Sequence, residues 1–220
     1  MIQACLFDLD GTLVNTLEDI SSAMNYALRQ FGLAEYSQDE YRYLVGNGAR
    51  KLAERAVRMR QDLVEDVLRC YQHRYETHNL VRSRPYEGIP EMLSDMKRRG
   101  WKLAVLSNKP DQDTKHVISH YFGDDIFDHV QGQKAGIPVK PDPTAALQIA
   151  QALEVSPGDM LYFGDTSVDM TCAVRSGMHP VGVLWGFREL EELKKSGAEW
   201  ILKTPKHWAQ VTDPGAHALF

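Results

Sequence analysis

From Pro85 onward, helical and extended patterns of apolar residues take turns along the chain, and this alternation limits the possible folds more than any other feature. The expected helices cover residues 90–99, 110–121, 142–153 and 167–176, and the expected strands cover residues 102–106, 127–130, 160–163 and 180–184. Strands that alternate with helices form a parallel sheet whose two faces are covered by those helices. We therefore expect an α/β fold with a Rossmann-like parallel sheet as its core.

The segment of residues 16–81 has only helical spacing and no strand signal. Its first expected helix ends near Gly32, a second starts near Gln38, a third covers residues 50–59, and a fourth covers residues 63–75. A chain of 220 residues is long enough for one sizeable core and a smaller domain, since a domain takes roughly 100–200 residues. We expect residues 1–15 and 82–220 to form the core domain and residues 16–81 to be an inserted helical domain.

Two acidic residues, Asp8 and Asp10, end the first apolar run of the chain. Their spacing places both side chains on the same side of an extended backbone, and Gly11 allows a sharp turn directly after them. Two neighbouring carboxylates repel each other unless a cation or a shared proton compensates. Taken alone, the pair also fits an Asp-Gly hairpin turn. A calcium loop is excluded, because its sixth residue would be Leu13 instead of glycine and its twelfth Asp19 instead of glutamate.

Further polar residues gather where the other expected strands end. Ser107 and Asn108 follow the second strand, Asp165 follows the fourth, and Lys140 precedes the helix that leads to it. Each has an ordinary explanation when it is taken alone, as a turn, a solvated lysine or a helix-capping acid. Parallel sheets, however, bind their ligands beyond the carboxyl ends of the strands. The shared position of these residues with Asp8 therefore predicts one polar site at that edge.

Four segments in this order resemble the motifs of the haloacid dehalogenase-like superfamily, whose members are mostly phosphatases. They are Asp8–Leu13, Ser107-Asn108, Lys140, and the acidic segment Gly164–Asp169. The resemblance implies that Asp8 attacks phosphorus and forms an aspartyl phosphate, while Asp10 acts as general acid and base. Such covalent catalysis divides one very slow displacement into two easier ones.

The same resemblance assigns the remaining polar residues. Mg²⁺, which prefers oxygen ligands, would be held by Asp8, Asp165 and the backbone carbonyl of Asp10. Asp169 would support the metal site without a direct bond to the ion. The phosphate group would be bound by Ser107, by the backbone N–H of Asn108 and by Lys140.

The place of the helical domain narrows the class further. Insertion between the first two strands of the sheet resembles the superfamily members with a small helical cap, and we call residues 16–81 the cap. Within that class, Val45–Arg50 and the Trp185-Gly186 turn are similar to phosphoglycolate phosphatases. Arg50 is then the expected cap contact of the substrate, pairing with the carboxylate of 2-phosphoglycolate.

Several alternatives stay open. A phosphosugar mutase, a pyrophosphatase or a sugar-phosphate phosphatase would have the same fold. A phosphoacceptor signalling domain also combines acids, a hydroxyl and a lysine around Mg²⁺, although its acceptor lies further along the chain and it has no inserted cap. A protein that binds phosphate esters without catalysis is disfavoured, because each expected catalytic position is filled.

Composition limits the partners and the compartment. The formal net charge is -5 without a basic stripe, which argues against nucleic acid as a partner. The three scattered cysteines argue for a reducing compartment, and no apolar run approaches the roughly 20 residues of a membrane span. We expect a cytoplasmic protein that acts as a monomer or homodimer on a small-molecule phosphate ester, with no nucleic-acid or membrane partner.

Overall fold

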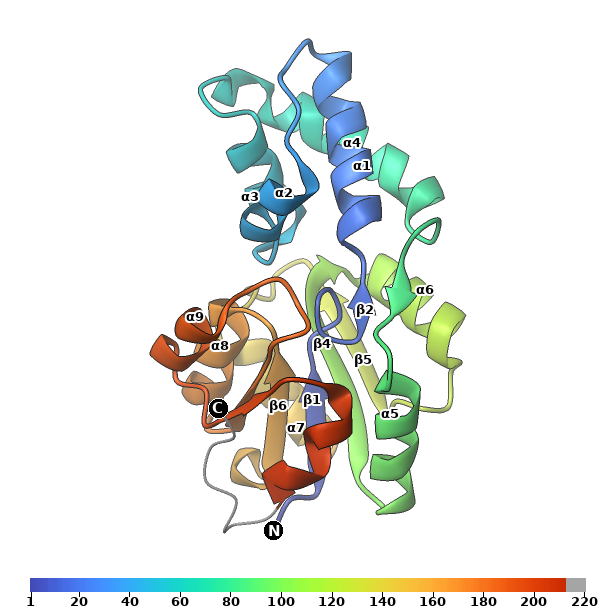
Figure 1. The fold of residues 1–220 in the computed structure, drawn as a ribbon, viewed down its shortest axis with the longest axis vertical. Coiled ribbons are helices and arrows are strands. Elements are labelled where there is room, and N and C mark those ends of the chain that lie inside the picture. Colours follow the sequence, from blue (N-terminus) through green and yellow to red (C-terminus); the bar gives the residue numbers. More distant parts are fainter. Residues whose placement is uncertain (213–220) are drawn as a thin grey trace.

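The computed structural model describes residues 1–212, which fold into a sheet-based core below a group of helices (Figure 1). The core sheet has six strands in the order β5-β4-β1-β6-β7-β8, and all neighbours pair in parallel. The strands are β1 (Ala4–Phe7), β4 (Lys102–Pro110), β5 (His129–Gln133), β6 (Met160–Gly164), β7 (His179–Val183) and β8 (Trp200–Leu202). The prediction of an α/β fold with a parallel sheet is confirmed.

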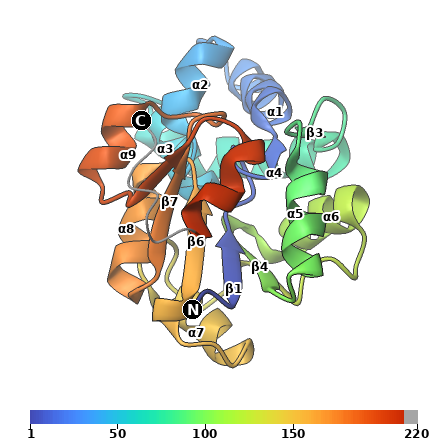
Figure 2. The ribbon, with the colours of Figure 1, turned by 60° about the horizontal axis from the view of Figure 1, so that its bottom comes forward.

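Helices cover both faces of this sheet. On one face lie α5 (Ile89–Arg98), α6 (Asp111–Phe122) and the 3-10 helix η3 (Pro205–Thr212), and on the other lie α7 (Thr144–Ala152) and α8 (Ser167–Ser176). Figure 2 shows α5 and α6 on one side of the strands and α8 on the other. The buried strand β1 serves both faces, since Cys5 and Phe7 pack toward α5 while Ala4 and Leu6 pack toward α7.

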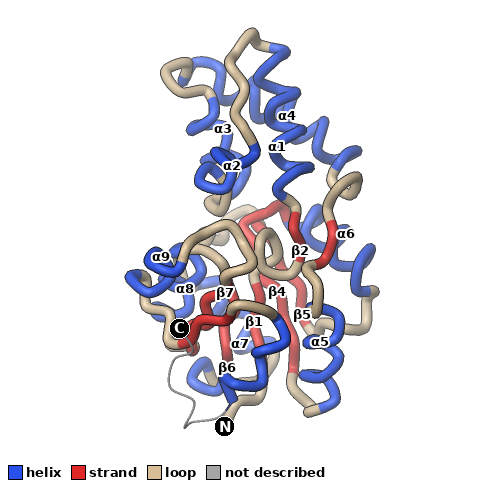
Figure 3. The backbone as a smooth tube through the Cα atoms, in the orientation of Figure 1, coloured by secondary structure: helices blue, strands red, loops and turns tan. Residues whose placement is uncertain are grey.

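The cap contains α1 (Leu17–Gln30), α2 (Gln38–Leu44), α3 (Gly48–Ala56), the short η1 (Gln61–Leu63) and α4 (Val64–His78). These helices enclose an apolar cluster of their own, and the cap stands over the carboxyl ends of the core strands. Figure 3 shows that the strands lie in the core and at the junction of the two parts. At that junction β2 (Val14–Asn15) pairs antiparallel with β3 (Arg84–Pro85). The exact boundaries of the cap stay a prediction.

Some elements differ from the expectation. Strand β4 continues through Ser107 and Asn108 to Pro110, and its pairing with β5 shifts register between Leu106 and Pro110. An irregularity of this kind lets polar residues stay in a strand while their side chains turn toward a site. The short α9 (Leu190–Lys195), η2 (Pro157–Asp159) and β8 have too few residues to produce a clear period, and the sequence patterns did not predict them.

Candidate active site

Three carboxylates meet at the carboxyl edge of the sheet. Asp8 follows β1 and Asp165 follows β6, and these strands are direct neighbours with Phe7 opposite Phe163. Asp169 lies in the first turn of α8. One oxygen from each of the three lies within 4.8 Å of the others, and all three side chains are buried. The structure thus brings together acids that are far apart in the sequence.

Asp8 has one committed and one open oxygen. Its Oδ1 accepts hydrogen bonds from the backbone N–H of Leu9 at 2.7 Å and from Nζ of Lys140 at 2.8 Å. Within the described chain, Oδ2 has no hydrogen-bond partner. Burial and, after it, the charge of Asp169 raise the pKa of Asp8, Lys140 lowers it, and the net result is a pKa of about 7. An open carboxylate oxygen beside a buried cation is suited to nucleophilic attack.

Lys140 lies between two acids. Its Nζ is 2.7 Å from Oδ1 of Asp169 and also donates to the carbonyl of Leu106 at 3.0 Å. Burial alone would lower the pKa of Lys140, but Asp169 and Asp8 raise it, so the side chain stays charged. Asp169 also accepts hydrogen bonds from the backbone N–H and the hydroxyl of Thr166. Both its oxygens therefore accept hydrogen bonds, and Oδ1 is paired with a charged lysine. Its indirect role at a metal stays a prediction.

Asp165 is fully buried and held from two sides. Its Oδ1 accepts from the hydroxyl of Thr12 at 3.2 Å, and its Oδ2 accepts from the backbone N–H of Phe187 at 2.8 Å. Burial, followed by Asp169 and Asp8, raises the pKa of Asp165 well above its usual value. Only glycine fits at position 11 beside it, because a Cβ there would lie 2.3 Å from Oδ2 of Asp165. Buried, crowded carboxylates with oxygen donors fit a hard divalent cation such as Mg²⁺.

Asp10 is not part of this cluster and has different hydrogen-bond partners. Its Oδ1 accepts hydrogen bonds from the hydroxyl of Thr16 at 2.6 Å and from Nζ of Lys109 at 2.7 Å. Both Asp8 and Asp10 line a pocket between the core and the cap. A group on a substrate in this pocket can therefore be reached by one acid that attacks and another that transfers a proton.

Two residues within the irregular part of β4, Ser107 and Asn108, also line the pocket. The side chain of Asn108 is used structurally, since Nδ2 donates to the carbonyls of Gly46 and Lys140 at 3.1 Å each and Oδ1 accepts from Lys140 N at 2.9 Å. The expected contact of its backbone N–H with a phosphate stays a prediction.

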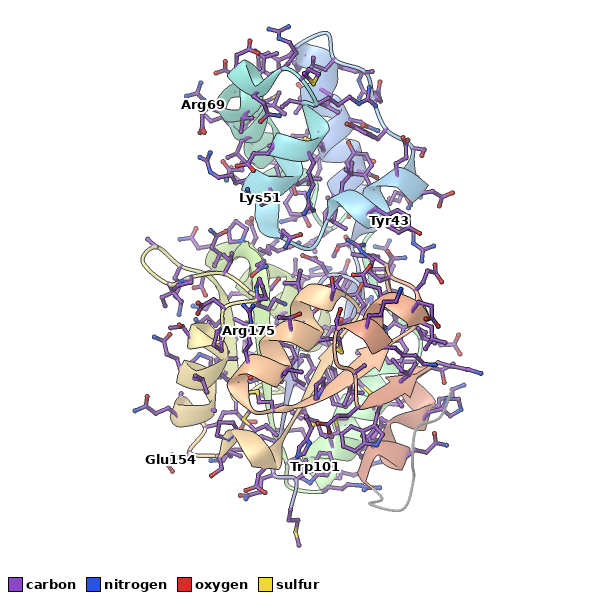
Figure 4. All side chains as sticks on the ribbon, turned by 90° about the vertical axis from the view of Figure 1, so that its left-hand side faces the viewer. Tyr43, Lys51, Arg69, Trp101, Glu154 and Arg175 are labelled. Carbon is purple, nitrogen blue, oxygen red and sulfur yellow. The ribbon has the colours of Figure 1, made fainter. Side chains whose placement is uncertain are left out.

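Arg50 does not line this pocket. Its guanidinium pairs with Glu65 through bonds of 2.5 and 3.0 Å, and its side chain is 57% exposed. Figure 4 shows other basic side chains of the cap, Lys51 and Arg69, likewise pointing outward. The expected contact of Arg50 with a substrate carboxylate stays a prediction, and it requires the side chain to leave Glu65.

Comparison with known proteins decides the family. The sequence profile of the haloacid dehalogenase-like hydrolases matches residues 5–183. The chain belongs to this family. The resemblance seen in its motifs is thereby confirmed.

Relatives within the haloacid dehalogenase-like family cover nearly the whole chain. A phosphoglycolate phosphatase of Aquifex aeolicus (strain VF5) is 32% identical over 189 residues, which are 86% of this chain and 88% of the relative. One from Colwellia psychrerythraea (strain 34H / ATCC BAA-681) is 28% identical over 210 residues, or 92% and 93% of the two chains. A solved structure named a predicted phosphoglycolate phosphatase, from Haemophilus somnus 129pt, has a TM-score of 0.89 at 27% identity and covers 96% of this chain and 98% of its own. These relatives make the chain a phosphatase of the haloacid dehalogenase-like family.

The cap of this phosphatase is joined to the core by reciprocal arginines. Arg42 of α2 donates to the carbonyls of Gly186 and Phe187 at 3.3 and 3.2 Å. In the other direction, Arg188 of the core donates to the carbonyl of Val45 at 3.0 Å. Its guanidinium also lies over the ring of Tyr43, 5.4 Å from the centroid, at the edge of the cap that faces the core (Figure 4). These bonds hold the cap over the acids.

Sequence reasoning missed several residues that support the site. Thr12 and Phe187 hold Asp165, Thr166 holds Asp169, and Lys109 pairs with Asp10. Lys109 had a usable signal, because it directly follows Ser107-Asn108 at a strand end. Phe187 had none, since only the fold brings its backbone to Asp165.

Over residues 1–212, no helix is both long and apolar enough to cross a bilayer.

Proposed function

We propose that this phosphatase is an Mg²⁺-dependent phosphomonoesterase that works through an aspartyl phosphate, with 2-phosphoglycolate as its substrate. The observation that carries the proposal is the open Oδ2 of Asp8 beside the charged Lys140, in a pocket that Asp10 also lines. The names of the relatives at about 30% identity support the substrate.

The metal would be held by Asp8, Asp165 and the backbone carbonyl of Asp10, with Asp169 supporting from behind. When bound, Mg²⁺ supplies positive charge that lets a phosphate dianion approach the carboxylate of Asp8. The acids fit this role, because their crowding and burial are unfavourable without a cation. Lys140, the hydroxyl of Ser107 and the backbone N–H of Asn108 would bind the phosphate oxygens.

In the first step, an oxygen of Asp8 forms a bond to phosphorus while the ester P–O bond breaks. The leaving oxygen takes the proton from the carboxyl of Asp10, which gives the free alcohol and the Asp10 carboxylate. In the second step, water attacks phosphorus and gives its proton to Asp10. The bond between Asp8 and phosphorus breaks, which releases inorganic phosphate and regenerates both acids.

The test is phosphate release from a panel of phosphorylated metabolites by the purified chain, with Mg²⁺ or with EDTA. We expect Mg²⁺-dependent turnover with the highest kcat/KM on 2-phosphoglycolate. A higher value on a sugar phosphate or on pyrophosphate would replace the substrate but keep the mechanism. Absence of Mg²⁺-dependent phosphate release from every compound would contradict the proposal.

A further inference from the structure

We propose that Lys109 is a positioning residue that orients Asp10 for proton transfer, and that Tyr75 makes this orientation depend on the closed cap. The inference rests on the proposed function, in which Asp10 protonates the leaving group. It adds to that function a core residue and a cap residue that act through Asp10 without touching phosphorus.

The first observation is the way Asp10 is anchored. Lys109 Nζ and the Thr16 hydroxyl both donate to Oδ1 of Asp10, at 2.7 and 2.6 Å. In the part of the chain that the structure describes, Oδ2 of Asp10 accepts no hydrogen bond. Two donors on one oxygen fix the rotation of the carboxyl group and leave the second oxygen for the substrate. A proton donor must lie within hydrogen-bond reach of the leaving oxygen, so this rotation matters for the reaction.

The second observation is the burial of the lysine. The side chain of Lys109 is 4% exposed, and Lys109 is the one cation among the described residues that line the pocket. A buried ammonium group is costly unless it is paired with an opposite charge and hydrogen-bond acceptors. Lys109 is thus confined to the place where its acceptors are, and an exposed lysine would not fix Asp10 in this way.

The third observation is where the other acceptor comes from. Nζ of Lys109 donates to the hydroxyl of Tyr75 at 2.9 Å and lies 4.9 Å from the centroid of its ring. Tyr75 belongs to α4 of the cap, while Lys109 and Asp10 belong to the core. The lysine therefore has one acceptor from each part of the molecule. When the cap moves away, Lys109 loses the bond that keeps its ammonium group in place beside Asp10.

Two other roles for Lys109 make different predictions. As a purely structural ion pair, it would affect all substrates equally when removed. As a direct contact of the substrate carboxylate, it would affect esters that carry a carboxylate and spare esters whose alkyl group is uncharged. As a positioning residue for the proton donor, it affects esters according to how much their leaving group needs a proton.

The test compares kcat/KM of Lys109→Met and wild type on 2-phosphoglycolate, ethyl phosphate and p-nitrophenyl phosphate with saturating Mg²⁺. This ratio covers steps only up to departure of the leaving group, so the later role of Asp10 as a base does not enter it. We expect losses of about 100-fold on both alkyl esters, the usual cost of misplacing a catalytic group by ~1 Å. On p-nitrophenyl phosphate, whose leaving group departs as a stable anion, we expect a loss of less than about fivefold. Lys109→Arg, which keeps a buried cationic donor, should recover part of the alkyl-ester activity.

Tyr75→Phe tests the link to the cap. It should lower kcat/KM on the alkyl esters in the same selective pattern, by about tenfold, and add nothing to the loss in Lys109→Met. Tyr71→Phe is the matched control, because Tyr71 stacks on Tyr75 at 5.5 Å while its hydroxyl makes no hydrogen bond within residues 1–212. Its ratio of alkyl to aryl activity should equal that of wild type. Binding of Mg²⁺, measured by calorimetry, should be the same in all variants.

Equal losses on all three esters, or a loss confined to 2-phosphoglycolate, would overturn the inference while the proposed function stands. If the losses of Tyr75→Phe and Lys109→Met multiply in the double variant, Tyr75 acts independently of Lys109 and has no part in positioning Asp10. If the wild type itself hydrolyses no phosphate ester with Mg²⁺, the inference and the proposed function both fail. Circular dichroism and the melting temperature identify a variant that is unfolded, in which case the result for Lys109→Arg decides.

Discussion

The backbone N–H of Phe187 donates a hydrogen bond to Oδ2 of Asp165 over 2.8 Å, while the side chain of Phe187 packs inside the apolar cluster of the cap. One residue of the core therefore contacts both Asp165, the proposed metal ligand, and the interior of the cap. Arg42 of the cap strengthens this connection by donating to the carbonyl of Phe187 at 3.2 Å. The support of Asp165 therefore depends on the packing between cap and core.

Phe187→Leu should weaken Mg²⁺ binding, although the backbone N–H that bonds Asp165 is still present. The smaller side chain loosens the packing that fixes this backbone, and the loss of a supporting contact typically costs about tenfold in metal affinity. Calorimetric titration with Mg²⁺ measures the effect. Phe127→Leu is the control, because Phe127 is buried among α6 and the core strands and should lower stability by about 1 kcal/mol without changing Mg²⁺ affinity. Equal Mg²⁺ affinities of the two variants would show that the packing of Phe187 in the cap does not support metal binding.

Asp165→Asn should weaken Mg²⁺ binding at least ~100-fold, since even a supporting partner is worth about 10–100-fold. The fold should survive, because Thr12 and Phe187 still find hydrogen-bonding atoms on an amide of the same shape. The melting temperature in EDTA should even rise. Burial raises the pKa of Asp165 far above its usual value, so its ionised form is unfavourable at neutral pH, and asparagine removes that charge. Unchanged Mg²⁺ dependence of turnover would exclude Asp165 from the metal site.

Affinity for Mg²⁺ should increase as the pH rises through 7. The pKa of Asp8 is raised to about 7, so below that pH the metal must displace a proton, and the apparent Kd should rise about tenfold per pH unit. In EDTA, where no metal is bound, the stability of the fold should change with pH in the opposite direction. The folded chain holds a proton that the unfolded chain releases above about pH 4, so the free energy of unfolding decreases between about pH 4 and 7. Titrations at several pH values measure both slopes, and Asp8→Asn should reduce them, while Asp165, whose pKa is also raised, still contributes. An affinity that is level from pH 6 to 8 would contradict this.

The sheet, the helices around it and most of the acids could be predicted from sequence because their signals are local. Asp8, Asp165 and Lys140 each follow or precede an apolar run, and the parallel arrangement of the runs brings their ends together. Contacts across the domain junction have no such signal. The bond of Tyr75 to Lys109 joins residues 34 positions apart on a helix and a strand, and its existence depends on how the cap sits on the core. For the same reason, the outward position of Arg50 could not be predicted from its place after a glycine-rich loop.

The pair formed by Arg50 and Glu65 suggests a way to test the arginine as a substrate contact. If Arg50 leaves Glu65 to bind the carboxylate of 2-phosphoglycolate, Arg50→Ala should cost about 1.5–3 kcal/mol of binding, as a charged hydrogen bond does. Glu65→Gln removes the competing partner and should lower KM for the same substrate. Asp62→Asn, which breaks the exposed pair with Arg60 just before α4, is the matched control. If neither Arg50→Ala nor Glu65→Gln changes KM, Arg50 has no part in recognition.

The two acids that follow β1 should be separable by substitution, because one forms a bond to phosphorus and the other moves a proton. Asp8→Asn removes the nucleophile and should abolish activity on every ester. Asp10→Asn keeps the nucleophile, and its amide oxygen can still accept from Thr16 and Lys109 as Oδ1 does. This variant should fail on alkyl esters at the first step, because their leaving group needs a proton.

With p-nitrophenyl phosphate, Asp10→Asn should stop one step later. The nitrophenolate leaves without protonation, so Asp8 becomes phosphorylated, but no base then activates water against the aspartyl phosphate. Rapid-quench measurements should therefore show a burst of nitrophenolate close to one equivalent per active site, followed by a slow steady rate. Mass spectrometry should find an adduct of about 80 Da, the mass of a phosphoryl group, on the peptide that contains Asp8. The metal site should be intact, since Asp10 is expected to contribute its backbone carbonyl there. A steady rate without a burst, together with an unmodified peptide, would show that Asp10 is not the base of the second step.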